Sequence, residues 1–154
     1  MGDLNVEDFK LLLEDRPAWE AKSKKDREDL VRASPAQLEV LWTSLLSDVD
    51  RAEITAEISE FLINAIREGL RESDAGMVDD SISQVRPWGF AVDRIHVPTQ
   101  IWHGDQDRFV PFQQGQWLAA HVPRTDAHLL QGEGHVTVLH RHVPDAQSWI
   151  ASLA

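Results

Sequence analysis

Two acidic residues and a histidine follow two short apolar runs in the second half of the sequence. Asp105 and Asp107 come directly after residues 95–103, and His135 follows residues 126–130 through a glycine turn. A buried carboxylate that accepts the Nδ1 proton of a histidine holds the tautomer of the ring and stabilises the imidazolium formed during acyl transfer. The pattern therefore predicts an acid–base pair suited to acyl transfer.

Such a pair needs a nucleophile, and the sequence offers none in a recognisable setting. Each of the ten serines lacks the flanking glycines of a Gly-x-Ser-x-Gly turn, and there is no cysteine to supply a thiolate.

Metal binding is the competing hypothesis for this region. His135, His140 and His142 cluster, and a His-x-His pair can bind zinc or nickel. The spacing from His135 to His140 does not keep one helical face, and no acidic residues are arranged nearby in sequence to support a site. We therefore expect neither a metal nor a cofactor.

The elements that must position the acid and the histidine are read from the pattern after residue 90. Residues 95–103 predict a buried strand, 112–122 a helix, 126–130 a second strand and 144–153 a last helix. Strands that alternate with helices are typical of a parallel α/β sheet, in which reactive groups gather at the carboxyl ends of the strands. Asp107 and His135 are expected to meet there.

The first half of the sequence predicts helices only. Asn5 is expected to cap a helix ending before Pro17, a charged helix covers residues 17–33, and Ser34-Pro35-Ala-Gln37 starts a third. The apolar face expected for that third helix is Leu38, Leu41, Trp42, Leu45 and Leu46. The strongest stripe, expected to pack in a core, is Ile54, Ile58, Phe61, Leu62, Ala65, Ile66 and Leu70.

Composition narrows the function classes. A net charge of −11 argues against nucleic acid or an anionic membrane as a partner. The N-terminus has no apolar segment typical of a secretory signal, and no apolar run reaches the roughly 18 residues that span a bilayer. Together with the absence of cysteine, these features predict a cytoplasmic protein.

Two motifs in this order carry a resemblance. Gly104-x-x-Asp107-x-x-Val110-Pro111, followed 28 positions after the acid by Gly132-x-Gly134-His135, resembles the C-terminal half of an α/β-hydrolase. Arg86-Pro-Trp-Gly-Phe90 is similar to the return from the helical cap in a bacterial group of small hydrolases. The resemblance implies a mostly helical α/β fragment, with a cap over residues 1–86 and the last two parallel strands of the core, with flanking helices, over residues 87–154.

The same resemblance assigns roles. Asp107 would be the acid and His135 the base of a catalytic triad, while Asp105 would be a solvated or loop-bonding neighbour. The family's nucleophile belongs upstream of the cap, so we expect a chain that is inactive alone in esterase- or amidase-like hydrolysis of a small-molecule acyl substrate.

A half sheet of two strands exposes edges that invite pairing, so we expect either a homodimer or docking onto a missing N-terminal half. The six tryptophans in an acidic chain favour such a covered surface. A non-catalytic binding or assembly module built from a hydrolase half is the alternative function, and an unrelated small α/β protein is the third hypothesis.

Overall fold

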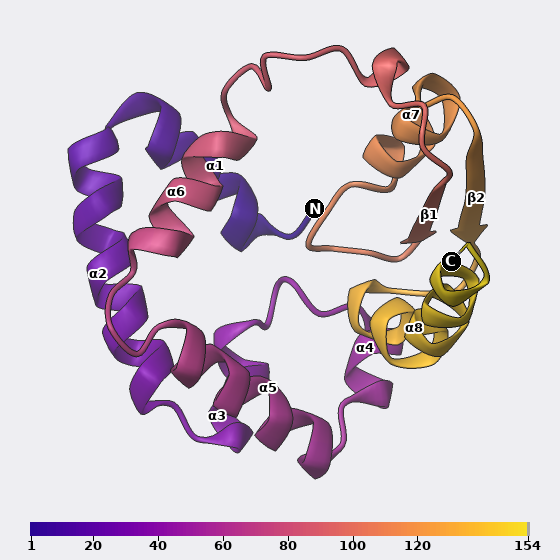
Figure 1. Cartoon of the computed structure of the whole chain (residues 1–154). Coiled ribbons are helices and arrows are strands. Elements are labelled where there is room, and N and C mark those ends of the chain that lie inside the picture. Colours follow the sequence, from indigo (N-terminus) through magenta and orange to yellow (C-terminus); the bar gives the residue numbers. More distant parts are fainter. Residues whose placement is uncertain (154) are drawn as a thin grey trace. The chain divides into compact units, whose positions relative to one another are not determined.

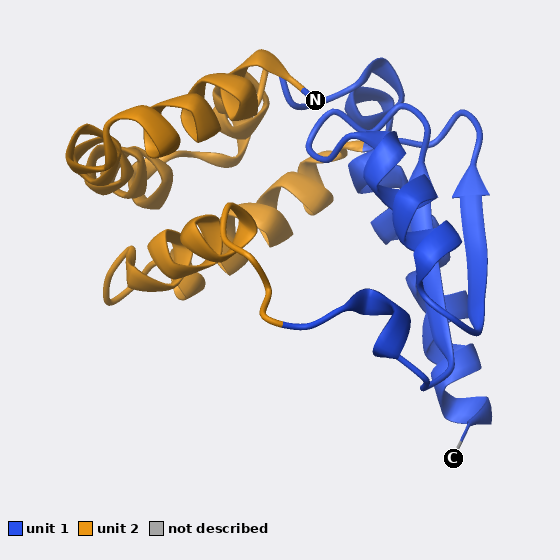
Figure 2. Ribbon diagram, turned by 90° about the horizontal axis from the view of Figure 1, so that it is seen from above, with its two compact units in different colours: residues 1, 44–53, 90–154 blue, residues 2–43, 54–89 orange. Residues whose placement is uncertain are grey.

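The computed structural model describes residues 1–153, which form two compact units (Figure 2). Residues 2–43 and 54–89 make up a helical unit; residues 1, 44–53 and those from 90 onward make up a sheet unit. We expected a single boundary between residues 86 and 87. In the structure the segment Ser44–Glu53, which lies inside the predicted cap, belongs to the sheet unit. Each unit is described by itself.

The helical unit contains five helices (Figure 1): α1 (Asp3–Glu14), α2 (Arg16–Arg32), α3 (Pro35–Leu41), α5 (Ala56–Gly69) and α6 (Ala75–Gln84). Its core is made of Ala33, Leu38 and Ile63, against which Leu41, Trp42, Leu62 and Ile66 pack. Two predicted helices are confirmed. The charged helix over residues 17–33 is α2, and the helix that carries the strongest apolar stripe is α5. The stripe itself was wrong at Phe61, which is 70% exposed, and at Ala65, which is also exposed, and it omitted Ile63, which is fully buried.

The start of α3 is confirmed in detail. The backbone N–H of Ser34 donates to Oε1 of Gln37 at 2.8 Å, and Pro35 occupies the first helical position. The predicted length is wrong, because α3 ends at Leu41. Leu45 and Leu46 are buried in the sheet unit instead, so tertiary burial overrides the helical periodicity that joined them to α3.

Asn5 does not cap the first helix. The helix begins at Asp3 with Gly2 as its N-cap, and the N–H of Val6 donates to the carbonyl of Gly2 at 3.2 Å. Glycine is an acceptable N-cap, and Asp3 places a negative charge in the first turn, where the helix dipole favours one. Asn5 therefore lies inside α1.

Two arginines close the C-terminal ends of α2 and α5 reciprocally. Arg67 of α5 donates to the carbonyl of Ala33 at 2.7 Å, and Arg27 of α2 donates to the carbonyls of Leu70 and Arg71 at 2.8 and 2.7 Å. Helix C-termini carry unpaired carbonyls and a partial negative charge, so each guanidinium meets both needs. The C-terminal ends of α2 and α5 are thus satisfied within the helical unit.

The sheet unit contains α4 (Asp48–Glu53), the short 3-10 helix η1 (Val92–Arg94), β1 (Thr99–Gly104), α7 (Phe112–His121), β2 (Thr125–Leu130) and α8 (His135–Ser152). The two strands pair in parallel, with Thr99 opposite Thr125 and Gly104 opposite Leu130. The chain is therefore mixed α/β, as expected, with two parallel strands and flanking helices. β1 begins after Pro98, which has no N–H to donate to a neighbouring strand.

The last helix was predicted wrongly at its start. We expected it to begin at Pro144, but α8 begins at His135 and Pro144 lies inside it. Proline removes one helical hydrogen bond and is disfavoured in a helix interior, which is why the sequence pattern suggested a start there. The early start places His135 in the first turn of a helix rather than in a loop. No helix in the described residues is both long and apolar enough to cross a membrane.

Candidate functional site

The turn after β1 orients the carboxylate of Asp107. The backbone N–H groups of Phe109 and Val110 donate to its Oδ1 at 2.7 and 2.9 Å, and its own N–H donates to the carbonyl of Gly104 at 3.2 Å. An aspartate that accepts from the backbone two and three residues ahead forms its own turn. One oxygen therefore holds the loop, and Oδ2 is left to face another group.

Oδ2 of Asp107 faces the ring of His135. Nδ1 of His135 lies 2.9 Å from Oδ2, so the N–H at Nδ1 donates to the carboxylate. The Asp107 side chain is 7% exposed and that of His135 is 35% exposed. The structure thus brings together the two residues that the sequence predicted as a pair, the acid buried and the imidazole partly open to solvent.

The pKa of Asp107 lies below its ordinary value. Burial opposes ionisation and would raise this pKa, but the hydrogen bonds from His135, Val110 and Phe109 and the charge of the imidazole outweigh burial and lower it. The carboxylate is therefore held in its charged form, the form that fixes the histidine tautomer.

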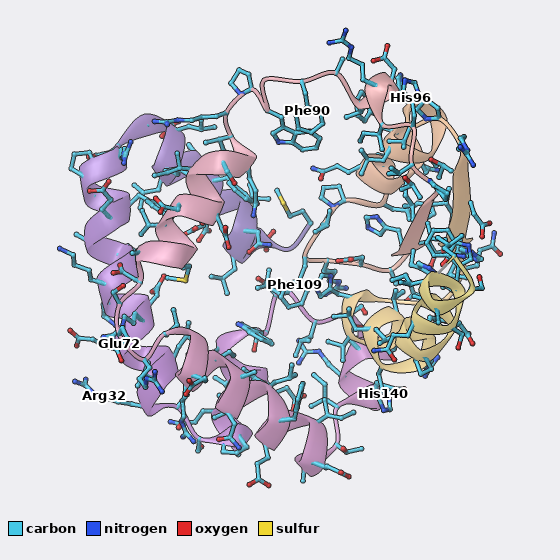
Figure 3. All side chains as sticks on the ribbon, viewed as in Figure 1. Arg32, Glu72, Phe90, His96, Phe109 and His140 are labelled. Carbon is cyan, nitrogen blue, oxygen red and sulfur yellow. The ribbon has the colours of Figure 1, made fainter. Side chains whose placement is uncertain are left out.

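Within the described residues, Nε2 of His135 makes no hydrogen bond. The ring of Phe109, which is labelled in Figure 3, stacks on the imidazole with ring centroids 4.4 Å apart. A histidine with Nδ1 bound to a carboxylate and Nε2 free can accept a proton at Nε2. This geometry is the one that a histidine acting as a general base requires.

A second histidine, His103 at the end of β1, was not predicted as part of the site. Its Nε2 lies 3.2 Å from the carbonyl of Val110 and 3.5 Å from Oδ2 of Asp107. Because the carbonyl can only accept, Nε2 donates to the carbonyl of Val110, with Oδ2 of Asp107 close by. Gly115 of α7 packs so closely on His103 that a Cβ would lie 2.3 Å from Nδ1. Its place at the end of a predicted buried strand was the feature of the sequence that could have identified His103.

Asp105 ties the two loops together, as the loop-bonding interpretation predicted. Its Oδ1 accepts from the backbone N–H of Gly132 at 2.8 Å, and its own N–H donates to the carbonyl of Leu130 at 2.9 Å. The neighbouring acids at the tip of β1 thus have separate tasks: Asp105 holds the loop after β2, and Asp107 holds the histidine. A Cβ on Gly104 would lie 2.1 Å from the carbonyl oxygen of Glu133, so these loops touch through backbone atoms.

Asp50 of α4 is a buried acid that sequence reasoning missed. Its carboxylate accepts from the backbone N–H groups of His135, Val136 and Thr137 at 3.2, 2.8 and 3.1 Å, which are the first three of α8. The separation of 85 to 87 residues hides this contact from any local pattern. The only local feature of the sequence at this point is Ser47-x-x-Asp50 at the start of a short helix. That pattern also occurs with acids on the surface, so it did not indicate that Asp50 is buried.

The three clustered histidines have three different environments. His135 bonds to Asp107, His140 bonds to Glu53 through Nδ1 at 2.5 Å, and the His142 ring stacks on Trp102 at 5.2 Å. No group of three or more metal-ligating side chains gathers among the described residues. The geometry gives the metal hypothesis no support.

Comparison of the chain with protein-family models, curated proteins and solved structures found no match. The assignment of a protein class therefore depends on the geometry of Asp107 and His135 and on the motifs that surround them.

Proposed function

We propose that the sheet unit carries the acid and the base of an α/β-hydrolase-type acyl hydrolase, with Asp107 as the acid and His135 as the base. The hydrogen bond between Nδ1 of His135 and Oδ2 of Asp107 carries this proposal. The buried, ionised acid in the turn after β1, the partly exposed imidazole in the first turn of α8 and the parallel strands behind both match the arrangement in which such pairs activate a hydroxyl.

In that reaction Nε2 of His135 takes the proton of a serine hydroxyl as its oxygen attacks the acyl carbon. The proton then passes from Nε2 to the departing alcohol or amine, and water repeats the two steps to release the acid. Asp107 stays ionised throughout and stabilises the imidazolium. Esters and amides of small molecules are the substrate class.

The serine is proposed to come from outside this chain, since none of its ten serines has the Gly-x-Ser-x-Gly setting. Without the nucleophile and its oxyanion hole, a base contributes little, so the chain alone is inactive in this proposal.

The partner that would complete the site is proposed to be an N-terminal hydrolase half whose strands extend the sheet. Within the described residues, β1 pairs only with β2, and each strand leaves its other edge unpaired. Trp117, Leu139 and Ile150 of the sheet unit are exposed. Such a half would cover both the open strand edges and these exposed apolar side chains.

The test is ester hydrolysis by complementation. The polypeptide encoded in frame directly upstream, if it contains Gly-x-Ser-x-Gly, is mixed with the chain and assayed with p-nitrophenyl acetate and butyrate. We expect turnover only in the mixture, and we expect Asp107→Asn and His135→Ala to abolish it. His121→Ala is the matched control, because this exposed histidine bonds to the carbonyl of Trp117.

A mixture that associates without turnover would favour the second candidate, a non-catalytic assembly module. The exposed apolar side chains and open strand edges favour that candidate independently of the acid–base pair. Light scattering of the chain alone then distinguishes a homodimer from a monomer that waits for the other half.

A further inference from the structure

Asp50 is a fully buried carboxylate that the acid–base pair does not use. Its relative exposure is 0%, and five donors surround it. Oδ2 accepts from the hydroxyl of Ser47 at 2.7 Å, from the N–H of Ser47 at 3.4 Å and from the N–H of His135 at 3.2 Å. Oδ1 accepts from the N–H groups of Val136 and Thr137 at 2.8 and 3.1 Å.

A charge in this position is costly unless it is compensated, and here the compensation is the end of a helix. Asp50 forms no ion pair with a side chain in the described part of the chain. The first amides of α8 supply both hydrogen bonds and the partial positive charge of the helix N-terminus. The carboxylate and α8 therefore neutralise each other.

The backbone is shaped to admit this carboxylate. A Cβ on Gly134 would lie 2.3 Å from Oδ2 and 2.4 Å from Oδ1 of Asp50. Only a glycine at the N-cap lets the carboxylate reach the amides of α8. The hydroxyl of Thr137 accepts from the N–H of Gly134 at 2.7 Å and so satisfies the donor of the N-cap residue itself.

His135 is the first residue of α8, so both the positive end of the helix and the carboxylate of Asp50 act on it. The positive end of a helix disfavours a second positive charge, yet a general base becomes an imidazolium during the reaction. The carboxylate of Asp50 offsets the helix end, and by accepting from the N–H of His135 it also fixes the backbone from which the ring extends toward Asp107.

We propose that Asp50 is a positioning residue for the base, acting on His135 through the first turn of α8. The role in catalysis rests on the proposed function. The effect of Asp50 on the His135–Asp107 hydrogen bond does not, and it can be measured in this chain alone. Asp50 touches neither the reacting atoms nor the ring.

The experiment compares Asp50→Asn with Glu53→Gln by NMR on the whole chain, without substrate. Glu53 is the matched control because it also links α4 to α8, through His140 and Arg141, but away from the first turn. The reporters are the proton at Nδ1 of His135, which a carboxylate partner moves far downfield, and the exchange of the Val136 and Thr137 amides. Loss of the Nδ1 signal in Asp107→Asn establishes its assignment.

We expect Asp50→Asn to shift the Nδ1 proton upfield and broaden it, and to accelerate exchange of the two amides about tenfold. Glu53→Gln should leave both unchanged. A Nδ1 signal in Asp50→Asn identical to that of the natural chain would overturn the inference and leave Asp50 as a helix cap only.

If Asp50→Asn does not fold, Ser47→Ala replaces it, since this variant keeps the carboxylate and removes its shortest hydrogen bond. A smaller upfield shift in Ser47→Ala supports the inference, and no shift contradicts it. Failure of the proposed function is separate: it would be absence of ester turnover in the complemented protein, with the Nδ1 signal still dependent on Asp50.

Discussion

The helical unit and the sheet unit differ in what they bury. The helical unit closes around aliphatic side chains, with Leu38 and Ile63 fully buried. In the sheet unit the buried set includes four polar residues, which are Ser47, Asp50, His103 and Thr137. Among the buried polar side chains of the described residues, only Ser23 belongs to the helical unit.

The two units also end their helices differently. In the helical unit the caps come from side chains near the helix end, such as Asp15 and Thr55, or from the reciprocal arginines of α2 and α5. In the sheet unit the N-terminus of α8 is capped by Asp50, which is more than 80 residues away in sequence.

This difference shows which part of the chain gives up stability to fix the positions of polar groups. Burying apolar area stabilises the folded state without specifying one orientation, whereas each buried polar group must be matched by a partner at a defined distance. The sheet unit accepts that cost at the residues around His135 and Asp107, as expected of a region that carries a site.

Ile63→Ala should break the helical unit and is the largest effect we expect. Truncating a fully buried aliphatic side chain in a tight core costs about 2 to 5 kcal/mol of unfolding free energy. Denaturant titration followed by amide exchange would locate the loss in the helical unit. Phe61→Ala, two positions earlier but exposed, is the control and should change stability by less than about 0.5 kcal/mol. Equal losses in both variants would contradict the burial pattern.

Gly104→Ala should damage the sheet unit through its backbone. The new Cβ would lie 2.1 Å from the carbonyl oxygen of Glu133, which cannot rotate away, so the loops after β1 and β2 must separate. Overpacking of this kind costs about 1 to 3 kcal/mol and should weaken the His135–Asp107 hydrogen bond. Gly76→Ala in α6 is the matched control, since nothing lies within 4 Å of its added Cβ, and alanine should stabilise that helix. A Gly104→Ala protein as stable as the natural chain would show that the loop contact is not tight.

Local patterns predicted much of this molecule because many of its interactions are local. The Ser34–Gln37 cap, the charged α2 and the parallel order of β1 and β2 all follow from neighbours in sequence. Asp107 and His135 were found because each follows the carboxyl end of a predicted strand, and those ends meet at one sheet edge.

The errors arose where distant contacts decide the structure. The first turn of α8 is capped by Asp50, a residue distant in sequence. The glycines around residue 134 therefore predicted a turn, and Pro144 suggested the start of a helix that in fact begins at His135. Phe61 and Ile63 both lie on one helix, and the positions of α2 and α3, which pack against that helix, determine which of them is buried. Periodicity gives a face but not the neighbour that covers it.

Asp107→Asn should sharpen the comparison through pH. The folded-state pKa of Asp107 is lowered from 3.8, so its charge stabilises the folded state above that pH, and this contribution is lost as the pH falls through the lower folded value. At pH 7 we expect the variant to be less stable by about 1 to 2 kcal/mol, since asparagine keeps an acceptor oxygen but loses the charge.

The difference between the natural chain and Asp107→Asn should persist from pH 7 to about 4. It should shrink below 3.8, where the unfolded natural chain takes up a proton at this carboxyl, and the loss is complete once the pH has fallen through the lower folded-state pKa. Asp105→Asn is the control within the same loop, because it loses a charge that holds Gly132 and not a histidine. Urea unfolding at several pH values measures both. A gap of constant size down to pH 2.5 would mean that shape, and not the charge facing His135, is what Asp107 contributes to the sheet unit.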